Sequence, residues 1–473
     1  MPGPIKKIQG SAKDILFQDD NMFFEFSDRY SIYDWGEMPD LIENKGANLF
    51  KMGVFFFEHL QSRGFKTHFL GVQNDLVQVK KFRVIKPELI DGRYNYSKIQ
   101  QAQNNFLIPL EVIFRFGAPQ GSSLLKANHE RLRELGLKKV QENEKFENPL
   151  IEFSTKLEPS DRMLFSKEAL EISGLCAEKF KELKKLASSL ALALKELTDL
   201  RGLELWDGKF EFALDEKGEL VLIDSVGVDE LRLTLEGAPL SKECLRQFYA
   251  KSDWRRRLLE RKSKVLNWKE LMLANEEIPA PLPLEALKMA RELYQLLHDV
   301  LAKGEGLERL RRLSKDIQAY LKPKRALVIG DGGREHALAL KLSQSPQVEK
   351  VFIQTKKRNI YANSQIETIP IENESELLDF IKKNSLDLIL IGPEQPLVDG
   401  LADKLRGQGA AVFGPGKAAS QLEASKAFSK KIMLKAGIPT ALYESFSDYQ
   451  DAMDFLEKTN WPDGYVVKAD GLA

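Results

Sequence analysis

Two segments near the start of the chain carry residues suited to binding a ligand. Segment 10–14 (GSAKD) joins two short apolar runs, and a turn of small residues there can present backbone N–H groups and Lys13 to a phosphate. An ordinary surface hairpin is the competing interpretation, and it is favoured for this segment alone because glycine turns are common. Segment 26–34 (FSDRYSIYD) gathers carboxylates, a guanidinium and hydroxyls after an apolar run. It indicates either a binding segment or a salt-bridged turn.

A third candidate combines an arginine with serine hydroxyls. In segment 108–115 (IPLEVIFR) strand alternation places Arg115 on the same side as Glu111, and a glycine turn at 121–123 (GSS) follows. An arginine fork with Ser122 and Ser123 is a natural grip for a phosphate monoester. An edge-strand arginine is the simpler alternative.

Two carboxylates define the candidate metal site. The runs 209–214 and 219–223, joined by the turn 215–218 (DEKG), predict a hairpin that brings Glu211 close to Asp224. Paired carboxylates among apolar residues repel unless a cation lies between them, and Mg²⁺ with a nucleotide phosphate is the usual case. Solvated hairpin charges are the alternative.

Composition excludes several classes of protein. The 473 residues carry 70 basic and 70 acidic side chains, so overall charge predicts neither a nucleic-acid nor a membrane partner. Cys176 and Cys244 are too few and too far apart for a disulfide framework or a cysteine metal site. The amino terminus lacks an apolar signal region, so we expect a cytoplasmic protein.

The elements that must position these residues follow successive patterns of predicted secondary structure. Residues 1 to about 115 read as short strands with one helix at 44–63, and a helical stretch at 166–199 precedes the hairpin. Together they predict an α+β body with a β-rich lobe. From 240 to 322 the pattern is helical, interrupted by the proline-rich segment 278–283 (IPAPLP).

A different pattern of predicted secondary structure begins at Pro323. The strand 325–329, a glycine turn, a helix and further strands at 350–354 and 387–391 predict a parallel α/β, Rossmann-like domain. Near Ser425 a third pattern starts, which predicts a helix to about Ala436 and a strand at 465–468.

Taken together and in order, the motifs of the first part resemble the phosphoribosylaminoimidazole-succinocarboxamide (SAICAR) synthetase family. The motifs are 10–14 (GSAKD), 26–34 (FSDRYSIYD), 44–46 (NKG), 108–115 with 121–123, 154–156 (STK), 207–212 (DGKFEF) and 229–232 (DELR). The resemblance implies that ATP, carboxyaminoimidazole ribotide and L-aspartate give SAICAR, ADP and phosphate, with Mg²⁺. The carboxylate is activated by phosphorylation and then attacked by an amine.

The resemblance also implies roles for particular residues. Lys13, Glu211 and Asp224 would be catalytic, Lys209 would join them in binding ATP, and Glu211 and Asp224 would hold the metal. Substrate binding would fall to Asp34, Lys45, Arg115, Ser122, Ser123, Lys156, Asp229 and Arg232. Two positions depart from the family, which commonly has a second lysine at Ser11 and a glutamate at Ser225. The two differences fall at one phosphate contact and in part of the metal shell.

The last part resembles phosphoribosylamine–glycine ligase, an ATP-grasp enzyme, over about 323–473. The motifs are 330–337 (GDGGREHA), 391–397 (IGPEQPL), 413–415 (FGP), 422–427 (LEASKA) and 467–473 (VKADGLA). A strand, glycine turn and helix start of this kind hold phosphate, and the candidates are Gly330, Gly332, Gly333, Arg334 and Glu335. The segments that complete an ATP-grasp site have no counterpart here, so we expect this module to be truncated and inactive alone.

We therefore predict four parts: a catalytic body at 1–240, a helical extension and linker at 241–322, an α/β domain at 323–424 and the start of an ATP-grasp domain at 425–473. The partners are small-molecule substrates, and a homo-oligomer stays open. One rival hypothesis makes the second half a non-catalytic scaffold for pathway enzymes. Another, based on Lys13 and the carboxylate pair alone, is a generic nucleotide-dependent kinase.

Overall fold

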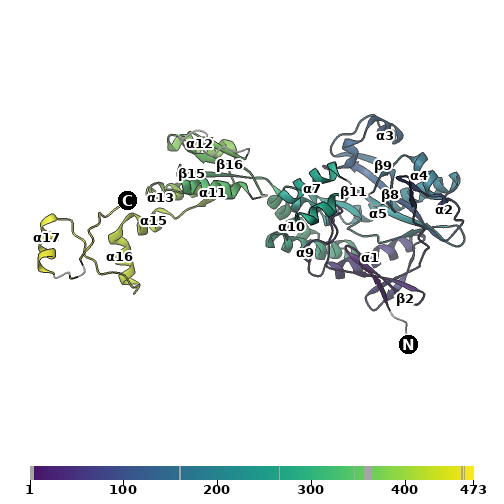
Figure 1. The fold of residues 1–473 in the computed structure, drawn as a ribbon, viewed down its shortest axis with the longest axis horizontal. Helices are drawn as coiled ribbons and strands as arrows, with labels where there is room; N and C mark the ends of the chain where they lie inside the picture. The colour runs from purple at the N-terminus through teal and green to yellow at the C-terminus, as the bar shows by residue number, and fades with distance from the viewer. Residues whose placement is uncertain are drawn as a thin grey trace. The chain divides into compact units, whose positions relative to one another are not determined.

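The computed structural model describes residues 5–158, 161–265, 267–345, 347–355, 365–459, 462 and 464–472. The chain divides into two compact units, Met1–Leu321 and Lys322–Ala473, and each has its own hydrophobic core (Figure 1). We describe each unit by itself.

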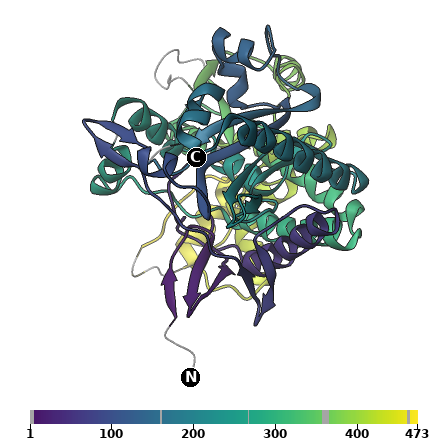
Figure 2. The same ribbon diagram turned by 90° about the vertical axis from the view of Figure 1, so that its right-hand side faces the viewer.

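The first unit opens with a five-stranded antiparallel sheet in the order β1-β2-β3-β5-β4. Its strands are β1 (Lys6–Ile8), β2 (Lys13–Gln18), β3 (Asn21–Phe26), β4 (Phe69–Gln73) and β5 (Leu76–Val79). Helix α1 (Lys45–Ser62) packs on this sheet, and both views show the helix beside the purple strands (Figures 1 and 2). Its buried residues Leu49, Met52, Phe56 and Leu60 recur every three or four positions, which is why one face of the helix enters the core.

A second sheet of seven strands forms the centre of the unit, in the order β10-β9-β8-β11-β13-β14 with β12 paired to β11. The strands are β8 (Phe106–Ala118), β9 (Glu144–Thr155), β10 (Met163–Leu164), β11 (Glu204–Leu214), β12 (Leu220–Ile223), β13 (Leu231–Leu235) and β14 (Ala238–Pro239). Smaller elements precede and connect them: β6 (Glu88–Ile90), β7 (Arg93–Asn95), α2 (Ser97–Gln100), η1 (Ser123–Lys126) and α3 (His129–Glu134).

The long central strands β8 and β11 have one apolar and one polar face. Val112, Phe114, Phe210 and Phe212 enter the core, where β8, β9 and β11 contact helix α5 (Ala177–Leu200). Because side chains alternate along a strand, residues 111, 115, 207, 209 and 211 project from the opposite face. The predicted hairpin is confirmed, since β11 and β12 pair with Glu211 opposite Ile223.

The helical stretch predicted over 166–199 is confirmed, and the structure divides it into two helices. Helix α4 (Ser166–Ser173) ends at Gly174, which has a φ of +74°, and α5 begins three residues later. The left-handed conformation at Gly174 ends the helix even though the apolar periodicity continues on both sides.

Helices dominate the rest of the first unit, as predicted. They are α6 (Ser241–Tyr249), α7 (Asp253–Lys264), α8 (Trp268–Ala274), α9 (Leu284–His298), the π-helical turn η2 (Asp299–Lys303) and α10 (Leu307–Leu321). Helix α9 contacts α1, α6 and α10, and its apolar residues belong to the same core as the two sheets. The extension is therefore packed into the body of the unit.

The second unit contains a parallel sheet in the order β17-β16-β15-β18-β19. Its strands are β15 (Lys324–Ile329), β16 (Val348–Gln354), β17 (Ile366–Ile369), β18 (Leu388–Ile391) and β19 (Val412–Phe413). The helices are α11 (Gly333–Ser343), α12 (Glu374–Asn384), α13 (Glu394–Val398), α14 (Leu401–Gly407) and α15 (Lys417–Ala424). Residues of α11 pack on one face of the sheet and residues of α12 and α14 on the other, which confirms the Rossmann-like prediction.

The last described elements are α16 (Lys426–Lys435) and α17 (Tyr449–Lys458). The strand predicted at 465–468 is absent, and Val466 and Val467 are both 80% exposed. A strand needs a neighbour to satisfy its backbone groups, and no described strand pairs with this segment. Over the described ranges, no helix is long and apolar enough to cross a membrane.

Candidate functional site

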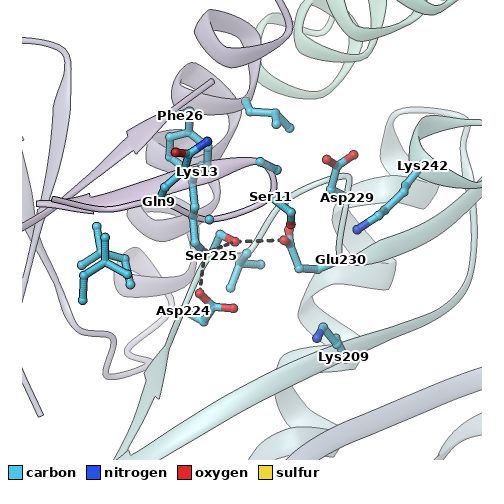
Figure 3. Close-up of a pocket in the computed structure, with 18 residues that line it drawn as sticks. Gln9, Ser11, Lys13, Phe26, Lys209, Asp224, Ser225, Asp229, Glu230 and Lys242 are labelled. Atoms are coloured by element: carbon cyan, nitrogen blue, oxygen red, sulfur yellow. Dashed lines mark hydrogen bonds and ion pairs between the residues drawn. The ribbon is translucent and has the colours of Figure 1, made fainter. Parts of the chain in front are cut away.

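A cavity of about 290 Å³ lies where the first sheet faces the loop that follows β12 (Figure 3). The β1–β2 turn, β3 and α1 form one wall, and the loop 224–230 with α6 forms the other. Three lysines and three acidic residues line it: Lys13, Lys209, Lys242, Asp224, Asp229 and Glu230. Its size and mixed charge suit a polyanionic ligand that is neutralised locally.

Lys13 stands at the first position of β2 and reaches across the cavity. Its Nζ contacts the Asp224 carboxylate and lies 2.7 Å from Ser225 Oγ. Asp224 directly follows β12 and has a φ of +65°, a left-handed conformation that turns the chain into the cavity wall. Although burial opposes it, Lys13 and Lys156 hold the pKa of Asp224 well below its usual range.

The turn that carries Lys13 is fixed from behind by Asp14. This side chain is buried, accepts a hydrogen bond from Gly10 N at 3.1 Å, and pairs with Arg29 and, at 2.7 Å, with Lys7. Despite the opposing effect of burial, Lys7 and Gly10 lower the pKa of Asp14. The turn is thereby held rigidly, as a phosphate-binding segment requires.

The polar face of β11 leads away from this cavity. Lys209 pairs with Glu111, and Lys156 Nζ lies 2.5 Å from Glu211. Burial and then the charge of Asp224 raise the pKa of Glu211 to about 7. That Glu211 and Asp224 share a cation stays a prediction, since each carboxylate is paired with a lysine in the structure.

A second cluster lies further along the same face. Arg115 pairs with Glu152, lies 3.3 Å from Asp207, and donates to Ser123 Oγ at 2.9 Å. Arg232 approaches the other oxygen of Asp207 at 3.5 Å. Arg115 thus contacts Ser123 directly and shares the Asp207 carboxylate with Arg232, while its own side chain is only 6% exposed.

Other predicted residues face elsewhere. The Ser122 side chain is buried and accepts from Leu124 N at 3.3 Å, so it caps η1. Asp34 is 79% exposed and pairs with Lys262 of α7 at 2.7 Å, outside the cavity lining.

Lys45 lies in the interior next to the cavity loop. Its side chain has no exposed area, its Nζ lies 2.9 Å from Asp229, and it stands over the Tyr294 ring. Tyr294 donates to the other oxygen of Asp229 at 2.6 Å. In this structure Lys45 therefore anchors the cavity loop to α1 and α9.

Sequence reasoning missed two charged residues that line the cavity. Glu230 accepts from Ser225 Oγ at 2.9 Å, and burial raises its pKa to about 7. Lys242, next to the start of α6, has its pKa lowered by burial. The adjacent acidic pair Asp229-Glu230 was a sequence signal that could have pointed to Glu230. No sequence signal marked Lys242.

In the second unit the predicted phosphate residues lie where the strand order reverses, between β15 and β18. Gly330 has a φ of +120°, and a Cβ there would meet Pro393 at 2.7 Å. Glu335 accepts from Gly332 N at 2.8 Å, and Arg334 pairs with Glu394 at 2.8 Å. Ligands of open α/β sheets bind at such a switch point.

Comparison with known proteins agrees with this division. The family model described as SAICAR synthetase matches residues 6–261. Phosphoribosylglycinamide synthetase models match further on, the N domain at 324–423 and the ATP-grasp (A) domain at 424–473.

Individual relatives give the same picture. A putative phosphoribosylaminoimidazole-succinocarboxamide synthase of Archaeoglobus fulgidus is 39% identical over 58% of this chain and 85% of its own. A phosphoribosylamine–glycine ligase of Clostridium acetobutylicum is 42% identical over 31% of this chain, which spans only 35% of that relative. The SAICAR synthase of Saccharomyces cerevisiae, solved with SAICAR, has 23% identity over 63% of this chain and 95% of its own, with a TM-score of 0.43.

These findings define the first unit as a ligase of purine biosynthesis. The chain belongs to the SAICAR synthetase family, whose model matches more than half of it. A module similar to phosphoribosylglycinamide synthetase follows in the same chain.

Proposed function

We propose that the cavity between the first sheet and the loop 224–230 binds ATP, and that the polar face of β8 and β11 binds the ribotide. The observation that supports this proposal is a series of three charged clusters: Lys13 with Asp224, Lys209 with Glu111 and Glu211, and Arg115 with Asp207. A transfer between two anionic substrates requires such clusters, because each phosphate must be neutralised where it is held.

In this account Lys13 and Lys209 contact the nucleotide phosphates. Arg115, Ser123 and Arg232 hold the ribotide phosphate, so the carboxylate of the base lies toward Lys209 and Lys156. A carboxylate oxygen of the ribotide attacks the γ-phosphorus of ATP and ADP leaves; the aspartate amine then attacks the acyl phosphate carbon and phosphate leaves. Positioning and charge neutralisation do the catalytic work, and no protein nucleophile is needed.

The residues present fit Mg²⁺. Glu211 and Asp224 offer carboxylate oxygens, and the charge of Asp224 raises the pKa of Glu211. Among the described residues, no group of three or more His, Cys, Asp or Glu side chains could hold a metal ion by itself. Two protein carboxylates completed by substrate phosphates are the usual Mg²⁺ arrangement. The ion would supply charge stabilisation to the transferred phosphoryl group.

For the second unit we propose phosphate binding at the switch point, by the backbone of 330–333 and Arg334. The chain spans about a third of the length of the glycine ligases it matches, so the ligase reaction stays a proposal for this unit. Turnover of phosphoribosylamine, glycine and ATP by this chain alone would contradict the expectation that the module is inactive alone. Binding of phosphoribosylamine without turnover would favour a scaffold role for this half.

Formation of SAICAR tests the proposal for the first unit. The purified chain, incubated with ATP, Mg²⁺, carboxyaminoimidazole ribotide and aspartate, should give a product heavier by the aspartyl group, detected by mass spectrometry. Omission of aspartate is the control. Phosphate transfer to a hydroxyl acceptor instead would support the kinase hypothesis.

A further inference from the structure

The loop after β12 carries three carboxylates that face different surroundings. Asp224 meets Lys13, and Asp229 points to Lys45 and Tyr294 in the interior. Glu230 faces the cavity, where Figure 3 shows its carboxylate joined to Ser225. Glu230 therefore has a role separate from that of its neighbour Asp229.

The hydrogen bonds around Ser225 have a defined direction. Its hydroxyl has one proton, which it donates to Glu230 Oε1 at 2.9 Å. The Lys13 ammonium can only donate, so at 2.7 Å it donates to the Ser225 oxygen. Because Glu230 accepts the hydrogen bond from the serine hydroxyl, the lone pairs of the serine oxygen are oriented toward Lys13.

Lys13 needs this second anchor because its first one is shared. Asp224, the other group that Lys13 contacts, is also a proposed ligand of Mg²⁺. The carboxylate of Glu230 reaches Ser225 from five residues further along the chain.

We propose that Glu230 is a positioning residue for nucleotide binding, which acts through Ser225 to aim Lys13 at the phosphates. This inference rests on the proposed ATP site. It assigns Glu230 no contact with the metal, and therefore predicts that the geometry of its acceptor oxygen matters more than its charge.

Four variants test this relay: Glu230→Ala, Ser225→Ala, the double alanine variant, and Glu230→Gln, whose amide oxygen can still accept the serine proton. Glu216→Ala, an exposed glutamate paired with Lys80 on the same hairpin, is the matched control. Binding of ADP is measured by titration calorimetry with Mg²⁺ and with EDTA, and KM for ATP and the half-saturating Mg²⁺ concentration are measured by turnover. Thermal unfolding verifies that each variant is folded.

We expect each single alanine variant to weaken ADP binding and raise KM for ATP about tenfold, the effect of one lost charge-assisted hydrogen bond. The double variant should be no worse than the weaker single variant, because both break one relay. Glu230→Gln should stay within about threefold of wild type, since a neutral hydrogen bond retains part of the strength. The half-saturating Mg²⁺ concentration should not change.

Additive losses in the double variant would overturn the inference. So would a Glu230→Gln variant as weak as Glu230→Ala with a raised Mg²⁺ requirement, which would make Glu230 a metal ligand. Unchanged variants beside normal wild-type binding would refute this inference alone, whereas a wild-type chain that binds no ADP would refute the proposed function as well.

Discussion

His68 lies beneath the cavity and gives the unit a pH-dependent stability. It is buried, its Nε2 lies 3.1 Å from the Asp224 carbonyl oxygen, and burial lowers its pKa to about 3. The unfolded chain protonates this ring near pH 6.5, so the unfolded state binds more protons between these values. Stability from His68 is therefore complete above about pH 6.5 and is lost as pH falls toward 3.

His68→Gln should remove that dependence. Between about pH 7.5 and 5.5 we expect wild type to lose about 1.4 kcal/mol more unfolding free energy than the variant. Urea unfolding followed by tryptophan fluorescence measures both. Equal losses in the two proteins would show that His68 is not held neutral.

At the scale of single residues, the sequence predicts which side chains carry charge. It does not predict whether a side chain faces the cavity or the interior. Lys13 and Asp224 were found because a glycine turn and a hairpin end mark them. Lys45 belongs to an equally clear motif, yet its side chain is fully buried against Asp229. Burial of a lysine depends on residues such as Tyr294, more than two hundred positions away, and no local pattern contains that information.

Helix α9 is tied to the cavity loop by one hydroxyl. Tyr294 donates to the buried Asp229 at 2.6 Å. Tyr294→Phe should cost about 1.5–3 kcal/mol of unfolding free energy, because a buried carboxylate loses a donor. Tyr94→Phe, at a half-buried hydroxyl for which the described residues show no hydrogen bond, is the control and should change stability little. A Tyr294 variant as stable as the control would contradict the anchoring role.

Helix α1 offers a matched pair of glycines. A Cβ at Gly46 would meet the Ser27 backbone at 2.8 Å, whereas at Gly53 it would meet only the Phe26 ring at 3.5 Å. We therefore expect Gly46→Ala to lower the melting temperature, because α1 must move away from β3 and the Asp28 bond to Gly46 N is strained.

Gly53→Ala should raise the melting temperature. The gain in helix propensity should add up to about 1 kcal/mol to the free energy of unfolding. Calorimetry of both variants checks the pair. The reverse order would show that the approach of Ser27 to α1 is not tight.

Elements with strong periodicity and a partner were predictable. Strand β15, helix α1 and the β11–β12 hairpin appear where the sequence placed them. The segment 465–468 has strand-forming residues but no described neighbour to pair with, and Gly174 divides a helix whose periodicity continues across it. Strand pairing and backbone conformation determine whether such segments form regular elements. The apolar periodicity of a sequence contains information on neither.

At the scale of the whole molecule, the division at Leu321 separates two cores. The predicted boundary at 240 has no such separation, because α6, α9 and α10 share the core of the sheets. We expect residues 1–321 expressed alone to keep the kcat of the full chain for SAICAR formation within about twofold. Residues 1–240 should be insoluble or inactive, because they lack helix α9, whose Tyr294 anchors Asp229. A large loss of kcat in 1–321 would mean that the second unit takes part in the first reaction.

We propose that the charged clusters around Lys13 and around Arg115 hold ATP and the ribotide next to each other. Aspartate-dependent ADP release with carboxyaminoimidazole ribotide tests it most directly, in wild type, Asp224→Ala and Arg115→Ala, with Arg256→Ala of the exposed face of α7 as control. We predict turnover in wild type and the control, and a loss of about a hundredfold or more in the other two. Turnover that survives in both Asp224→Ala and Arg115→Ala would contradict the site assigned here.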